Sequence, residues 1–178
     1  MTEKLKSIVS SLNAEVKNNS VYVWGGQGEK LLSSGFIEIL NMEDTPENAA
    51  RIAKHVKTLL KSGKSLKNSR IFDCSGLIGQ VLIDHKILKS DTTADGIYRK
   101  ALAEGSKVAV AKMKAGDLVF KVSNGRAVHV GMCVGANGKC VEAMGRDVGV
   151  VARENGKGSK WDVAIRVKKW YDDVEVDE

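Results

Sequence analysis

The spacing of the hydrophobic residues follows a helical period before Gly105 and a strand period after it. A first amphipathic helix is predicted near the N-terminus, because apolar residues recur there three and four positions apart: Leu5, Ile8, Val9, Leu12 and Val16. A second helix is predicted to begin at Thr45, where a capping residue precedes a proline and an acid, and to end near Gly63. Two further helices are expected from about Asp73 to Lys86 and over residues 91–104.

Beyond Gly105, apolar residues alternate with polar ones, which predicts a series of strands. Residues 136–139, with the sequence ANGK, predict a two-residue hairpin turn, and residues 155–158 predict another turn. Helices therefore precede a run of consecutive strands, an order that predicts an α+β domain with N-terminal helices packed on an antiparallel sheet. The predicted strands cover about 118–122, 128–134, 140–144, 148–152 and 163–167.

Composition and charge narrow the class of protein. The 178 residues suit one domain, and 28% charged with 43% hydrophobic residues is ordinary for a globular chain. The net charge of +6 favours an anionic partner, such as nucleic acid, a phosphate-rich polymer or a membrane surface. The basic segment 61–70 is predicted to be disordered and the acidic tail 172–178 to be solvated. No apolar stretch is long enough to span a bilayer, and the N-terminus lacks the apolar core of a secretory signal.

Three cysteines and three histidines are the scarce reactive residues of the chain. Cys74 follows Asp73 at the start of a predicted helix, where backbone N–H groups and the helix dipole favour the nucleophilic thiolate. A buried structural cysteine is the alternative interpretation. Cys133 and Cys140 are not directly opposed in the predicted hairpin, so we expect no disulfide between them, and their spacing is not that of a zinc site.

Among the histidines, we expect His55 to be solvated on a lysine-rich helix and His85 to cap the end of another helix. His129 lies on an apolar strand, where a buried structural histidine is the alternative interpretation. A cysteine at the start of a helix packed on a sheet, with a histidine on a strand of that sheet, gives the geometry of a thiol–imidazole pair. In such a pair the imidazole takes the thiol proton and later donates it to the leaving amine.

Five short segments occur in an order that resembles the NlpC/P60 family of cysteine peptidases, over about residues 20 to 170. Any one of them is a weak signal, but five in order with suitable spacing are a specific one. The segments are Tyr22-Val23-Trp24-Gly25-Gly26, Asp73-Cys74-Ser75-Gly76, Ala115-Gly116-Asp117-Leu118-Val119-Phe120, His129-Val130-Gly131-Met132 and Val141-Glu142-Ala143.

The resemblance implies a papain-like α+β fold with Cys74 as the nucleophile and His129 as the general base. Glu142 matches the position of the polar residue that orients the imidazole, a task that a carboxylate can perform by accepting the Nδ1 proton. Tyr22 matches a tyrosine near the nucleophile and is expected to bind the oxyanion with the backbone N–H of Cys74. The neighbouring Trp24, Asp73 and Ser75 are predicted to line the substrate site, and no cofactor or metal is expected.

Two departures from the family pattern affect these expectations. The segment between Gly26 and Asp73 is long, which indicates a helical insertion at about 27–70 in one catalytic domain over 1–178. A two-residue turn at Asn137-Gly138 would place Glu142 about 13 Å from His129 along the sheet, so a bulge or strong twist would be needed. Asp147 and Asn124 are the alternative residues for orienting the imidazole.

The activity that the resemblance implies is hydrolysis of peptidoglycan stem peptides, at an amide between D-γ-glutamyl and a diamino acid, through a Cys74 thioester. With that activity, the positive charge suits an anionic wall polymer rather than nucleic acid. A papain-like amidase or acyltransferase, and a non-catalytic phage structural or wall-binding module, are the alternatives. Without a signal peptide, we expect a phage- or prophage-type protein that is cytoplasmic until release or associated with the virion.

Overall fold

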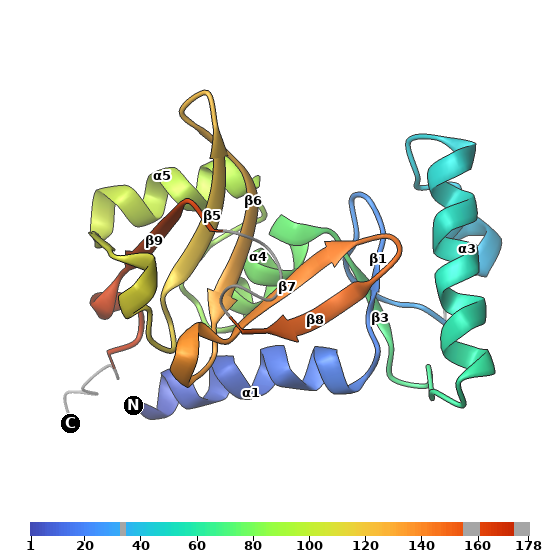
Figure 1. The fold of residues 1–178 in the computed structure, drawn as a ribbon, viewed down its shortest axis with the longest axis horizontal. Coiled ribbons are helices and arrows are strands. Elements are labelled where there is room, and N and C mark those ends of the chain that lie inside the picture. Colours follow the sequence, from blue (N-terminus) through green and yellow to red (C-terminus); the bar gives the residue numbers. More distant parts are fainter. Residues whose placement is uncertain (33–34, 155–160, 173–178) are drawn as a thin grey trace.

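The computed structural model describes residues 1–32, 35–154 and 161–172, and its largest element is a six-stranded antiparallel sheet (Figure 1). Across the sheet the strands follow the order β4 (Ser106–Val108), β9 (Val163–Arg166), β5 (Leu118–Ser123), β6 (Arg126–Cys133), β7 (Cys140–Gly145) and β8 (Gly149–Arg153). The antiparallel sheet predicted from the alternation after Gly105 is therefore confirmed. The turn predicted at 155–158 lies outside the described residues.

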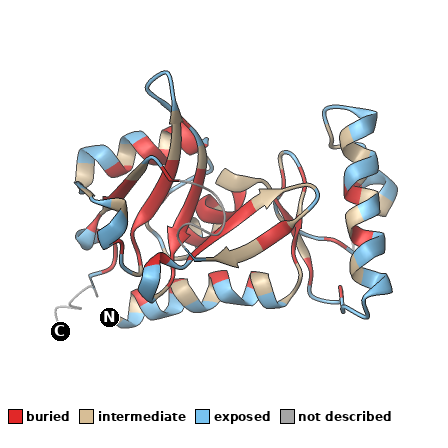
Figure 2. Ribbon diagram, in the orientation of Figure 1, coloured by how far each residue is buried: buried red, intermediate tan, exposed pale blue. Residues whose placement is uncertain are grey.

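Three helices share one hydrophobic core with this sheet: α1 (Glu3–Lys17), α4 (Cys74–Asp84) and α5 (Ala94–Glu104). Each begins at a residue whose side chain accepts a backbone N–H of the first turn, namely Thr2, Asp73 and Thr93. Figure 2 shows buried residues along β5, β6 and β7 and on the inner sides of these helices. The α+β prediction thus holds, with helices packed against the sheet.

A second core lies beside the first, around a three-stranded sheet of order β1 (Val21–Tyr22), β3 (Arg70–Phe72) and β2 (Gln27–Lys30). Strand β1 runs parallel to β3, although almost fifty residues separate them. Two helices, α2 (Phe36–Leu40) and α3 (Pro46–Lys61), and the loops beside them supply the other apolar side chains of this core. Helix α3 stands apart from the six-stranded sheet and exposes most of its surface (Figures 1 and 2).

The prediction of disorder over 61–70 is wrong. Helix α3 ends at Lys61, but Leu66 is buried in the second core at 4% exposure. Ser69 donates its hydroxyl to the carbonyl of Asn19, and the Asn19 amide donates to the carbonyl of Ser65. One apolar side chain and these hydrogen bonds anchor a segment whose composition is otherwise polar.

The hairpin between β6 and β7 differs from the predicted two-residue turn. Met132 is paired with Val141 and Cys133 with Cys140, so six residues form the connection instead of two. A 3₁₀ turn, η2 (Ala136–Gly138), occupies the middle of it. Two other 3₁₀ turns are η1 (Val110–Lys112), between β4 and β5, and η3 (Lys168–Trp170), after β9. The expectation that Cys133 and Cys140 are not opposed is therefore wrong, and their free thiols lie 2.9 Å apart.

A β-bulge also changes the alternation predicted for the start of β6. The β5–β6 register shifts after Lys121, so that Val122 pairs with Ala127 and Val128 is passed over. Ala127 takes the buried position, while Val128 is 59% exposed instead of facing the core. The bulge restores the predicted pattern at His129 and Val130, the latter being fully buried.

Replacing Phe120 by alanine is expected to destabilise the protein by about 3–5 kcal/mol, because it leaves a cavity at the centre of the main core. Phe120 is fully buried, and Tyr98 packs edge-on against its ring at a centroid distance of 5.0 Å. Urea unfolding measures the effect. The matched variant Val128→Ala should change the free energy of unfolding by less than about 0.5 kcal/mol. Equal losses in the two variants would contradict the assigned core.

Within the described residues, none of the helices is both long enough and apolar enough to cross a membrane.

Candidate active site

Cys74 is the first residue of α4, immediately after the strand β3 and the capping residue Asp73. One oxygen of the Asp73 carboxylate accepts the backbone N–H of Gly76 at 2.6 Å, and the other accepts that of Gly25 at 3.0 Å. The second contact ties the loop after β1 to the start of α4. A Cβ at Gly76 would lie 2.0 Å from the carbonyl oxygen of Gly26, so glycine permits this close approach.

His129 on β6 and Glu142 on β7 form a short hydrogen bond, with 2.6 Å between Nε2 and Oε2. The side chains of His129 and Glu142 are only 15% and 2% exposed. The register described above brings Glu142 two positions closer to His129 than the predicted turn would, so neither an added bulge in this pair of strands nor a long separation is needed. The predicted use of Nδ1 for this contact is wrong, because Nε2 makes it.

The pKa of His129 is raised to about 9 by its surroundings. Burial alone would lower it, but hydrogen bonds with Cys74 and Glu142, together with the charges of these two groups, outweigh that effect. Since Nε2 faces Glu142, the ring nitrogen left for Cys74 is Nδ1. The structure therefore brings a thiol and a carboxylate to the two nitrogens of one imidazole, and the raised pKa keeps that imidazole charged at neutral pH.

Trp161, just before β9, packs against the face of the imidazole. The sequence patterns did not identify this residue. Its ring stacks on His129 at a centroid distance of 5.5 Å and an interplanar angle of 2°. A Cβ at Gly131 would lie 2.9 Å from the Trp161 ring, which explains why glycine follows two residues after the histidine. A glycine in an otherwise apolar strand is the signal that could have indicated this close approach.

Tyr22 lies beside Cys74 at the end of β1. Its pKa is raised to about 12, first by burial and then by the charges of Cys74 and Asp73, against a smaller opposite effect of Arg146. The phenol is therefore protonated at neutral pH and able to donate a hydrogen bond. The guanidinium carbon of Arg146 lies 5.4 Å from the centroid of the Tyr22 ring.

The remaining predicted site residues border one cavity of about 540 Å³ next to Cys74. Trp24 is 54% exposed at its edge, and the Ser75 hydroxyl donates to Asp73 at 3.2 Å. Burial raises the pKa of Asp73, although the hydrogen bonds from Gly76 and Gly25 oppose this. The cavity wall includes Tyr22, Trp24, Asp73, Cys74, Ser75 and Asp91.

The alternative orienting residues lie elsewhere. Asp147 accepts hydrogen bonds from Arg51 on α3, and Asn124 is exposed in the β5–β6 turn with a φ of 49°.

The other two histidines lie outside this site. We predicted that His55 is solvated, but it is half-buried, and burial lowers its pKa. His85 caps α4 as predicted, through a 2.8 Å contact of Nδ1 with the Val81 carbonyl.

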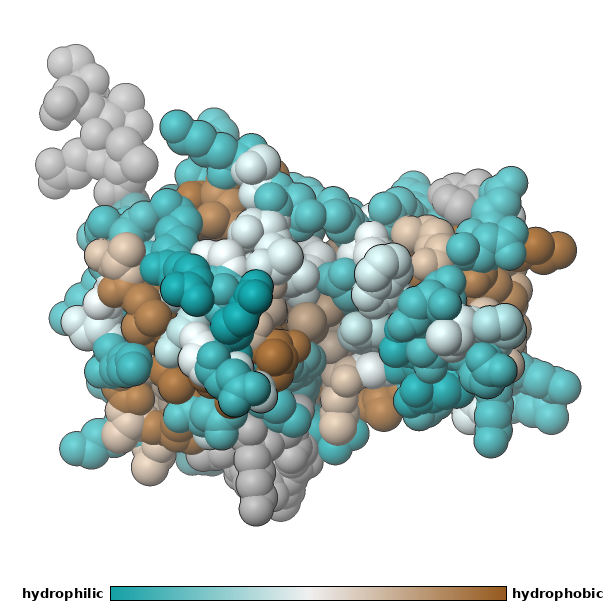
Figure 3. Space-filling model, turned by 90° about the horizontal axis from the view of Figure 1, so that it is seen from above, coloured by the Kyte–Doolittle hydropathy of each residue, from teal (hydrophilic) through white to brown (hydrophobic). Residues whose placement is uncertain are grey.

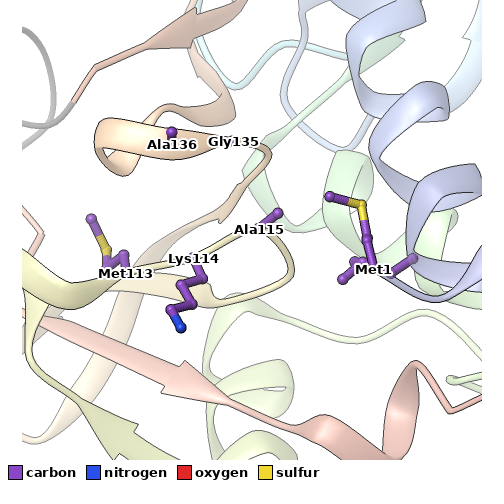
Figure 4. A pocket seen from close by; sticks show the side chains of 7 residues that line it. Met1, Met113, Lys114, Ala115, Gly135 and Ala136 are labelled. Carbon is purple, nitrogen blue, oxygen red and sulfur yellow. The ribbon is translucent and has the colours of Figure 1, made fainter.

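A second cavity lies on the surface, and its lining does not include Cys74, His129 or Glu142. A cavity of about 350 Å³ has Met1 and Met113 at opposite ends and is otherwise lined by Leu5, Lys114, Ala115, Gly135 and Ala136 (Figure 4). Seen from above, the surface is largely hydrophilic, with smaller hydrophobic patches between (Figure 3). Among residues 1–32, 35–154 and 161–172, no three His, Cys, Asp or Glu side chains gather as metal ligands would.

An α+β domain that sets a helix-borne thiol against a histidine–glutamate pair is the class of protein that this geometry defines. The chain belongs to the NlpC/P60 family, whose model matches residues 19–167. Its fold is similar to that of the NlpC/p60 domain of the peptidoglycan hydrolase SagA, at 21% identity and a TM-score of 0.53, covering 91% of this chain and 97% of that one.

The fold is also similar to that of the P60 domain of an antigen from M. avium subspecies paratuberculosis. The identity is 17% and the TM-score 0.50, with 93% of this chain and 95% of that one covered. A comparison with curated protein sequences finds no match. The family and fold expected from the five sequence segments are thus confirmed.

Proposed function

We propose that this protein is a cysteine peptidase that hydrolyses amide bonds in peptidoglycan stem peptides. The observation that carries the proposal is the connected set of Cys74, His129 and Glu142, in which the carboxylate and imidazole are 2.6 Å apart. Membership of the NlpC/P60 family and the fold likeness to a domain of a peptidoglycan hydrolase support the substrate class. The proposed bond lies between D-γ-glutamyl and a diamino acid.

In the first half of the reaction, the Cys74 sulfur attacks the amide carbonyl and forms a tetrahedral intermediate. The protonated Tyr22 hydroxyl and the backbone N–H of Cys74 donate hydrogen bonds to its oxyanion. The His129 imidazolium then gives its proton to the leaving nitrogen, so that an amine departs and a thioester remains. Glu142 stabilises the imidazolium and fixes its ring in the orientation that this transfer needs.

In the second half, neutral His129 takes a proton from a water molecule that attacks the thioester carbonyl. The intermediate collapses and the carbon–sulfur bond breaks, which releases the free acid. The electron pair of that bond stays on the Cys74 sulfur, and His129 keeps the proton it took from water, so both groups are back in their starting state. Trp161 covers the face of the imidazole throughout, which excludes water from that side. Trp24, Asp73 and Ser75 line the cavity in which the peptide would lie.

We further propose that residues 27–70 are a helical insertion within a single catalytic domain, which borders the cleft and attracts an anionic wall polymer. Helices α2 and α3 with their own core support the first part. The second part is supported by exposed lysines of α3 and the loop after it: Lys54, Lys57, Lys61, Lys64 and Lys67.

Mass spectrometry of the products from defined muropeptides tests the proposed function, with Cys74→Ala as the matched control. Cleavage of the proposed bond yields two fragments whose masses together equal the substrate plus one water. Release of sugar from peptide would instead indicate an amidase, and a product that contains an added acceptor would indicate an acyltransferase. Unchanged substrates with every wall fragment would overturn the peptidase proposal and favour a binding module.

A further inference from the structure

A buried ion pair lies directly behind the active-site tyrosine. Arg146, in the turn after β7, donates from Nε to an oxygen of Glu43 at 2.6 Å and from a terminal nitrogen to Asp44 at 3.3 Å. The side chains of Arg146 and Glu43 are 15% and 0% exposed. Burying such a pair removes much of both charges from water, so the pair contributes little to stability by itself, and its contacts are better explained by another role.

The contacts of this pair converge on Tyr22. The Arg146 guanidinium lies over the Tyr22 ring, with 5.4 Å between its carbon and the ring centroid. The second oxygen of Glu43 accepts the backbone N–H of Trp24 at 2.7 Å, two residues beyond the tyrosine. One carboxylate therefore ties the backbone that follows Tyr22 to the guanidinium that covers its ring.

We infer that Arg146 and Glu43 are positioning residues that hold the Tyr22 hydroxyl where the oxyanion forms. The inference rests on the proposed function. It gives the segment before α3 a part in the reaction, because Glu43 binds Arg146 of the β7–β8 turn and Arg146 contacts the Tyr22 ring. Without Arg146 and Glu43, the Tyr22 ring would lose the contact on its face and the backbone tether beside it. A misplaced donor lowers the rate of the chemical step more than it weakens substrate binding.

The neighbouring pair of Arg51 and Asp147 provides a matched control. It joins the same helical segment to the same turn, with the Arg51 Nε 3.0 Å from a carboxylate oxygen. Its side chains are 48% and 58% exposed, unlike the buried pair behind Tyr22. A variant of Arg51 therefore removes a clamp between α3 and the turn without removing the guanidinium from the tyrosine ring.

Steady-state kinetics on a muropeptide substrate, with a double-mutant cycle, test the inference. Arg146→Gln and Glu43→Gln should each lower kcat by about 10- to 100-fold, with KM changed less than about threefold, since loss of one oxyanion donor costs about 10²- to 10³-fold. In a Tyr22→Phe background, Arg146→Gln should add less than about a twofold loss, because the group it positions is already gone. Arg51→Gln should stay within about twofold of the parent protein.

Additive losses in the cycle, or an equal loss in Arg51→Gln, would overturn the inference and leave a general structural role. Because the parent protein must be active for that experiment, NMR of ¹³C-labelled tyrosine supplies a readout that needs no substrate. The chain has three tyrosines, and Tyr22→Phe assigns one ring signal. That signal should shift or broaden in Arg146→Gln and Arg146→Lys but not in Arg51→Gln.

The two failures are distinguishable. An inactive parent protein whose Tyr22 signal still responds to Arg146 would contradict the proposed function alone. An active parent protein whose Tyr22 signal is unchanged in folded Arg146→Lys would contradict the positioning role alone.

Discussion

Replacing Cys74 by alanine is expected to lower the rate of amide hydrolysis in muropeptides by at least about 10³-fold, because no thioester can form without the sulfur. Folding should survive the change. Cys74 is half-buried at the edge of a cavity, and alanine suits the first turn of a helix. We expect the free energy of unfolding to change by less than about 1 kcal/mol, as measured by urea unfolding.

Labelling with iodoacetamide provides a second measurement on the same variant. Cys133 and Cys140 are fully buried or nearly so, at 0% and 2% exposure. The native protein should therefore incorporate one label rapidly at Cys74, and Cys74→Ala should incorporate none on that timescale. A Cys74→Ala variant that retained more than a tenth of the hydrolysis rate would sink the assignment of the nucleophile, whatever the labelling showed.

Replacing Glu142 by glutamine is expected to reduce kcat by about 10²- to 10⁴-fold, as the loss of the orienting carboxylate does in related triads. The same variant should also lose activity at a lower pH than the parent protein does, so that the alkaline limb of its pH–rate profile moves. The pKa of His129 is about 9, so the parent protein keeps its imidazolium through neutral pH and loses activity as pH rises through 9. Without the charge and hydrogen bond of Glu142, the pKa of His129 falls and the limb moves to lower pH.

Stability should follow the same ionisation. Because the pKa of His129 in the folded state lies above its unfolded value of about 6.5, the pairing stabilises the protein fully below that value. This stabilisation is lost as pH rises through 9. Thermal unfolding across pH 6 to 10 should therefore show a smaller alkaline decline for Glu142→Gln than for the parent protein.

Asp147→Asn is the matched control for Glu142→Gln. Asp147 is a carboxylate just beyond the same β7 strand, but it is paired with Arg51. Its replacement should leave the alkaline limb at pH 9. An unmoved limb in Glu142→Gln, or a moved limb in Asp147→Asn, would contradict the role of Glu142.

Local signals determined much of the fold. Thr45 with the following proline marked the start of α3, and Asp73 marked the start of α4, because a helix cap acts within its own first turn. The alternation from Leu118 onward predicted the strands because side chains on neighbouring strand residues point to opposite faces, which is also a local property. Where a local feature was irregular, as in the bulge that exposes Val128, the alternation gave the wrong face.

These local signals could not predict contacts between segments that are distant in the chain. The parallel pairing of β1 with β3 joins residues on either side of the α2–α3 segment. Leu66 is buried in a core that these strands and helices form together. The hairpin of β6 and β7 shows the limit most clearly. A six-residue connection instead of two changes which residues are opposed, and with it the positions of Glu142 and Cys140.

The sequence by itself determined the starts of α3 and α4, the strands from Leu118 onward and the family pattern, since each depends on residues close together in the chain. It also led us to propose Cys74 and His129 as the reactive pair. Only the tertiary structure decided that Glu142 meets Nε2 of His129, that Trp161 stacks on its ring and that Arg146 covers Tyr22. These contacts depend on strand register and on loops that return from far along the chain. Register is fixed by how the whole sheet packs on its helices, and no short segment carries that information.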